Sequence, residues 1–120
     1  MEAARAILAS LGIESIDEMN VNENYTVEVH GYEDLTIEKI SPDRLSVAHH
    51  YVQRGDLMCD PEIVFHIDNG VWTPVRFTQH PHVHRHDPTG LELGGFVTQW
   101  SENLREQGFL DAAKEIPEQC

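Results

Sequence analysis

Apolar and polar residues alternate repeatedly between residues 25 and 77, and this period of two limits the fold more than any other feature of the chain. In the first such stretch, Tyr25, Val27 and Val29 alternate with polar residues. Successive side chains of a β-strand point to opposite faces, so the pattern is typical of half-buried strands. The same alternation predicts four further strands, over residues 35–38, 45–51, 63–67 and 71–77.

Helical periodicity appears on both sides of these strands. Residues 3–11 place their apolar side chains on one face, and Gly12 follows as a left-handed stop. Residues 95–107 form a second amphipathic segment that Gly108 can cap. We therefore expect a single α+β domain over residues 1–120. It should contain a mainly antiparallel five-stranded sheet, with the N-terminal and C-terminal helices packed on one face.

The stretch DNG between the last two predicted strands is a hairpin signal. A three-residue loop, Asp68 to Gly70, places Ile67 opposite Val71 and brings the apolar sets of both strands to one face. A two-residue loop would instead pair Ile67 with Trp72. Register follows the hydrophobic pattern, so we expect the three-residue loop, with Gly70 at positive φ.

The charge of the chain limits its partners. Its 21 acidic and 8 Lys or Arg residues give a formal net charge of -13, which should repel nucleic acid. Three explanations stay open: an ordinary acidic surface, adaptation to a salty cytoplasm, and mimicry of nucleic-acid phosphates. No apolar run is long enough to cross a membrane, and two cysteines make no disulfide framework, so we expect a cytoplasmic protein.

The connection QRGDLMCDP, together with the strand before it, carries the first candidate site. His49, Asp56, Asp60 and Glu62 are a candidate functional cluster for acid–base chemistry or cation binding. A structural explanation competes with this one. Gly55 permits a turn and Pro61 fixes the entry to the next strand. The aspartates would then bind backbone N–H groups, and His49 would be a core residue.

The stretch QHPHVHRHD carries the second candidate site. In an extended chain its alternate histidines point the same way and can bind a metal ion; they are His80, His82, His84 and His86. Asp87 or His66 is a candidate third ligand. The competing explanation is an exposed polar edge that binds zinc or nickel only adventitiously. If this explanation holds, we expect no cofactor.

Two tryptophans are assigned structural roles. Trp100 lies on the apolar stripe of the second helix, where we expect it to be buried with its indole N–H bonded to a neighbour. Trp72 lies in the last predicted strand. Phe109 and Leu110 should return toward the core after Gly108.

Two parts of the sequence resemble a known family. LSVAHHYVQRGDLMCDPEIVF is similar to the central motif of domain of unknown function 6908, in which a strand with a histidine leads into GDLM, a variable residue, DPE and a second strand. WTPVRF and FVTQWSENLREQGF resemble the following strand and C-terminal helix of that family. The resemblance covers roughly residues 35 to 110, and the matching positions are His49, Gly55, Asp56, Leu57, Met58, Asp60, Pro61, Glu62, Trp72, Pro74, Trp100, Asn103, Gln107, Gly108 and Phe109. It implies no established activity, does not include the four histidines, and suggests an accessory protein of phages, plasmids or integrated elements.

Taken together, these features favour a small non-enzymatic binding domain that acts through protein–protein contacts, with a partner that the sequence does not name. A homodimer is compatible with this interpretation. Two alternatives stay open. One is a metal-dependent enzyme that uses a His/Asp cluster, and the other is an acidic inhibitor of a nucleic-acid-binding defence complex.

Overall fold

The computed structural model describes residues 1–53, 56–79 and 83–114, without the side chains of residues 51–60, 83, 84 and 94. The described helices are α1 (Glu2–Ser10), the short 3-10 helix η1 (Ile16–Glu18), α2 (Gly94–Glu106) and α3 (Phe109–Lys114). The strands are β1 (Asn24–Val27), β2 (Asp34–Ser41), β3 (Arg44–Gln53), β4 (Asp56–Asp68), β5 (Val71–Gln79) and β6 (Val83–His86).

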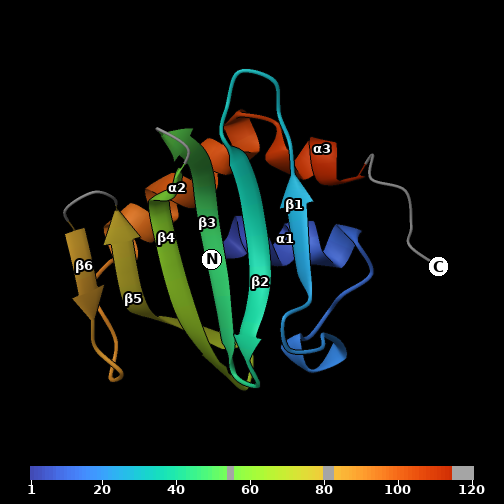
Figure 1. The fold of residues 1–120 in the computed structure, drawn as a ribbon. Coiled ribbons are helices and arrows are strands. Elements are labelled where there is room, and N and C mark those ends of the chain that lie inside the picture. Colours follow the sequence, from blue (N-terminus) through green and yellow to red (C-terminus); the bar gives the residue numbers. More distant parts are fainter. Residues whose placement is uncertain (54–55, 80–82, 115–120) are drawn as a thin grey trace.

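The strands form one antiparallel sheet in the order β1-β2-β3-β4-β5-β6, so every strand pairs with its neighbour in the sequence (Figure 1). The predicted α+β class and antiparallel pairing are confirmed, but the prediction of five strands is wrong because β6 adds a sixth. Residues 56–61 were predicted to be part of a long connection. They are instead the first half of β4, which pairs with β3 as far as Gln53 and Asp56.

The register predicted for the β4–β5 hairpin is wrong. Asp68 pairs with Val71 and Ile67 with Trp72, which leaves a two-residue loop of Asn69 and Gly70. Both loop residues have positive φ, 50° and 77°, as a type I′ turn requires. The positive φ predicted for Gly70 is therefore confirmed, although in a shorter loop.

A β-bulge reconciles this tight turn with the apolar pattern. Phe65 pairs with Pro74 and Val64 with Arg76, so Val75 is an extra residue in β5. Beyond the bulge, Phe77 lies opposite Ile63, and both side chains are buried in the core. Before the bulge the even-numbered residues of β5 face the core, and after it the odd-numbered ones do. Strict alternation from the turn does not predict this change.

A second bulge lies in β4. Ala48 pairs with Glu62 and His50 with Cys59, so Asp60 and Pro61 together oppose His49. Proline has no N–H to donate to a strand ladder, and a bulge is one of the few places in a sheet that tolerate it.

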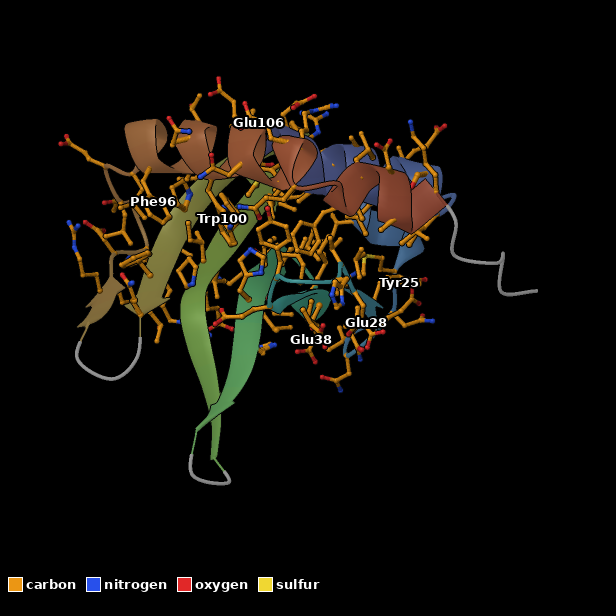
Figure 2. All side chains as sticks on the ribbon, turned by 90° about the horizontal axis from the view of Figure 1, so that it is seen from above. Tyr25, Glu28, Glu38, Phe96, Trp100 and Glu106 are labelled. Carbon is orange, nitrogen blue, oxygen red and sulfur yellow. The ribbon has the colours of Figure 1, made fainter. Side chains whose placement is uncertain are left out.

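One hydrophobic core joins the helices to the sheet. It contains residues of α1, α2 and α3 together with residues of β1 to β5, among them Ile7, Leu104, Phe109, Val47 and Phe65. Figure 2 shows α1, α2 and α3 on the same side of the strands. The N–H of Ala3 donates to Ser101 Oγ across 2.9 Å, which ties α1 to α2. After α1, Gly12 has φ 88° and the Ile13 N–H donates to Leu8 O, so the predicted stop is confirmed.

Candidate functional site

Of the first candidate cluster, the structure describes the side chains of His49 and Glu62, and it does not bring these two together. His49 lies on the face of β3 that carries Leu45 and Val47 toward the core. Glu62 pairs with Ala48 and therefore lies on the opposite face of the sheet. The hypothesis that His49 and Glu62 form a joint acid–base site is wrong, because the sheet separates their side chains.

His49 is a core histidine, as the structural explanation predicted. It is 9% exposed, and its ring lies 5.7 Å from the ring of Trp100 and 5.3 Å from that of Phe109. Its Nδ1–H donates to the carbonyl of Glu33 across 3.0 Å. Aromatic packing and a backbone hydrogen bond account for this residue without a ligand.

Glu62 lies on the outer face of the sheet and is held by its neighbours. Ser46 Oγ donates to one carboxylate oxygen at 2.6 Å, and Arg76 Nη2 lies 3.4 Å from the other. The side chain is only 19% exposed. This arrangement satisfies the carboxylate within the sheet, which is what a structural role requires.

The remaining members of that cluster lie outside the description. Gly55 is outside the described residues, and the side chains of Asp56 and Asp60 are not described. Their predicted bonds to backbone N–H groups stay a prediction. Within the described residues, no group of three or more His, Cys, Asp or Glu side chains could hold a metal ion.

The histidine-rich stretch is described only in part. His80 and His82 lie outside the described residues, and of His84 only the backbone in β6 is described. His86 is exposed and pairs with Arg76, which places it on the outer face. The two proposed third ligands have other partners: Asp87 accepts hydrogen bonds from the backbone N–H and the hydroxyl of Thr89, and His66 donates to Asp43.

Trp100 is 6% exposed, so its predicted place in the core is confirmed. Figure 2 shows it pointing from α2 toward the strands. The predicted hydrogen bond of its indole is not seen among the described residues, where the buried Nε1 has no partner. Gly108 has φ 92° and ends α2 as predicted, and α3 then begins at Phe109.

A concavity of the described surface lies at the other end of the core. It is an open groove of about 790 Å³ between α1, residues 13–17 and the turns that join β2 to β3 and β4 to β5. Both turns lie at the lower edge of the sheet in Figure 1. The apolar side chains that line this groove are Ala6, Leu8, Ala9, Ile13, Ile16, Pro42, Leu45, Ile67 and Trp72.

The polar lining of the groove is acidic. One cation, Arg5, accompanies five carboxylates, which belong to Glu2, Glu14, Asp17, Asp43 and Asp68. Three of these, Glu14, Asp17 and Asp68, are exposed, and within the described residues their carboxylates have no hydrogen bond or ion pair. They are therefore available to a ligand.

The other two carboxylates already have partners. His66 Nε2 donates to Asp43 at 2.9 Å and Ser41 Oγ at 3.2 Å. Desolvation acts to raise the pKa of Asp43, but these hydrogen bonds outweigh it and the pKa is lowered. A hydrogen bond from Arg105 likewise lowers the pKa of Glu2. Both groups therefore stay ionised at neutral pH, which keeps the groove negative.

The sequence did not indicate this groove. Its residues come from four separate segments, and none of them forms a motif. One signal was present: Trp72 stands next to a turn, where a large aromatic side chain has few neighbours to cover it. Its ring packs 5.5 Å from Phe65, and it is half-buried.

A family model, described as a domain of unknown function (DUF6908), matches residues 3–110 of the chain. No curated protein matches the chain, and no solved structure does. In the described residues no helix is long and apolar enough to cross a membrane.

Proposed function

The chain belongs to the DUF6908 family, and from its groove we propose that it is a non-enzymatic binding domain that holds a cationic, partly apolar segment of another protein. The single observation that carries this proposal is the combination of an apolar floor with an acidic rim. An accessory role in a mobile element would be compatible with such binding.

The floor of the groove supports an apolar anchor. Trp72 and Ile67 are both partly buried and pack against the core, so each still presents part of its side chain to the groove. Tryptophan is enriched among the residues that contribute most to protein interfaces, because it offers a large rigid surface. A groove of this volume is in the range that accommodates a short segment rather than a whole domain face.

The rim supports a cationic occupant. Carboxylates of α1, of residues 14–17 and of both turns surround the floor, and Arg5 is the only cation among the described residues that line the groove. Opposite charges across an interface steer association and exclude partners of the wrong sign. A lysine- or arginine-bearing segment therefore fits this groove, and an acidic one does not.

A peptide titration tests the proposal. The probe is a fluorescein-labelled amphipathic peptide of leucine and arginine, and the matched peptide carries glutamate in place of arginine. We expect the basic peptide to raise the fluorescence anisotropy and to bind more weakly as salt is added, because screening reduces attraction between exposed charges. The acidic peptide should not bind.

Paired variants separate the groove from the general negative charge of the chain. Asp17→Asn with Asp68→Asn removes two charges from the rim, and Glu28→Gln with Glu106→Gln removes two exposed charges elsewhere (Figure 2). The rim pair should weaken binding about tenfold, and the distant pair less than about twofold. Equal losses would show that the peptide binds the overall charge and not the groove, and the proposal would be withdrawn.

A further inference from the structure

Lys39 occupies a position that strand alternation assigns to the core. It follows Leu35 and Ile37 on the same face of β2, and it pairs with Leu45, which is fully buried and lines the groove. Lys39 itself is only 6% exposed. A buried ammonium group costs free energy unless hydrogen bonds replace its lost water. Its retention at this position therefore needs a physical reason.

The ammonium is held by backbone carbonyls. Lys39 Nζ donates to Ile16 O at 3.0 Å and to Met19 O at 2.7 Å. Ile16 is the first residue of η1, and Met19 is its C-cap. The ion pairs found among the described residues do not include Lys39. The backbone of Lys39 is bonded to the residues that follow this segment, since its N–H donates to Glu23 O and its carbonyl accepts from Asn22 N–H.

These bonds hold one wall of the groove. Ile16 and Asp17 line the groove, and the carbonyl of Ile16 is one of the two that the ammonium binds. We infer that Lys39 is a positioning residue for partner binding: its ammonium fixes residues 16–19 against β2 and so sets the wall that the occupant meets. This inference rests on the proposed function for the identity of the occupant.

Electrostatics and positioning predict opposite results when this charge is removed. Lys39→Met replaces lysine by another unbranched side chain, which is apolar, and so deletes a positive charge beside an acidic groove. If charge alone mattered, a cationic probe should then bind more tightly. If the ammonium positions the wall, the probe should bind more weakly, because the wall is no longer fixed in the binding geometry.

The experiment measures affinity for the leucine–arginine peptide and amide hydrogen exchange of residues 13–22. Lys39→Met should weaken binding about fivefold or more and speed exchange at Met19 and Asn22, whose N–H groups bond to Ile16 O and Lys39 O. Lys114→Met is the matched control, because it deletes the same charge from an exposed site in α3 away from the groove. It should change affinity less than about twofold. Lys39→Arg, which keeps a cationic donor, should recover most of the affinity.

Tighter or unchanged binding by Lys39→Met, with unchanged exchange, would overturn the inference. If the wild-type chain fails to bind the peptide, the proposed function fails, and the exchange data alone then decide whether Lys39 fixes the wall. If Lys39→Met does not fold, the wild-type chain provides the test. Peptide binding should slow exchange at Met19 and Asn22 more than at Tyr32, whose N–H bonds within the turn after β1, and equal slowing would contradict the inference.

Discussion

The core of this domain is closed at one end and open at the other, although a tryptophan stands at each. At the closed end, Trp100 packs with His49 and Phe109 beneath α2 and α3. At the open end, Trp72 and Ile67 lie beside the groove, and the nearest covering elements are α1 and residues 13–17. Both ends use the same face of the same sheet.

The difference shows that the covering elements decide the role of an apolar sheet face. The same face forms closely packed core under one covering and a groove under another. At the closed end two helices bring aromatic and aliphatic side chains directly onto the strands. At the open end an irregular segment, tied down by a buried lysine, lies beside the strands and leaves a groove. The next three predictions test this contrast, from the largest expected effect to the smallest.

Truncating the two tryptophans should separate the two ends most clearly. Trp100→Ala should lower the free energy of unfolding by about 3–5 kcal/mol, because it deletes a large buried side chain from a core. Trp72→Ala should cost about half as much, since its side chain is only half-buried, but it should abolish peptide binding. Urea denaturation of both variants measures the difference. Equal losses of stability would remove the distinction between a closed and an open end.

The turn at the open end should depend on its backbone and not on side-chain packing. A Cβ at Gly70 meets no atom within 4 Å, but the residue has φ 77°. Gly70→Ala should therefore cost about 1 kcal/mol through strain alone. Gly95→Ala is the control, because its Cβ also enters open space and its φ is not positive. It should be neutral or slightly stabilising in α2, and an equal cost at both sites would argue against a strained turn.

The smallest effect should come from the ion pair of Glu2 and Arg105, which links α1 to α2. The hydrogen bond from Arg105 lowers the pKa of Glu2 below its ordinary value of 4.5. The stabilisation is therefore present above pH 4.5 and is lost as pH falls through the lowered value. Both side chains are largely exposed, so solvent screening should make this effect the smallest of the three. Thermal unfolding of Arg105→Gln and wild type should converge in acid, and a constant difference across this range would exclude the pair as its source.

Local patterns in the sequence were sufficient for most of the fold. Alternation located five strands, and the helical stripes located α1 and α2 within one or two residues. The glycine stops at Gly12 and Gly108 were also predicted correctly, because φ above zero is a property of single residues. These features depend on neighbours in the chain, which a sequence displays directly.

The errors arose where distant residues decide the outcome. The bulge at Val75 depends on pairing with β4, so counting from the turn alone gave the wrong register. The strand β6 follows Pro81 and is rich in histidine, a composition that does not predict a strand. The core position of His49 was foreseen, but its separation from Glu62 required knowledge of the opposing strand.

The groove and Lys39 were beyond prediction for the same reason. The carbonyls that stabilise the buried Lys39 belong to residues 16 and 19, which are distant in the sequence. No pattern around Lys39 predicts this contact. The acidic rim likewise gathers side chains from α1 and both turns. The overall negative charge argued against direct nucleic-acid binding, but it did not indicate where on the surface these carboxylates gather.

The extra residue at Val75 also lets the chain absorb one change of length. Because Phe65 pairs with Pro74 and Val64 with Arg76, Val75 has no partner in β4, and deleting it would join Pro74 directly to Arg76 without moving either pairing. Arg76 would stay on the outer face, and Phe77 would stay opposite Ile63 in the core. A second deletion would find no extra residue left to absorb it, and it would exchange the two faces of the strand beyond it. Homologous chains that lack this one residue should therefore keep the same pairing of β5 with β4.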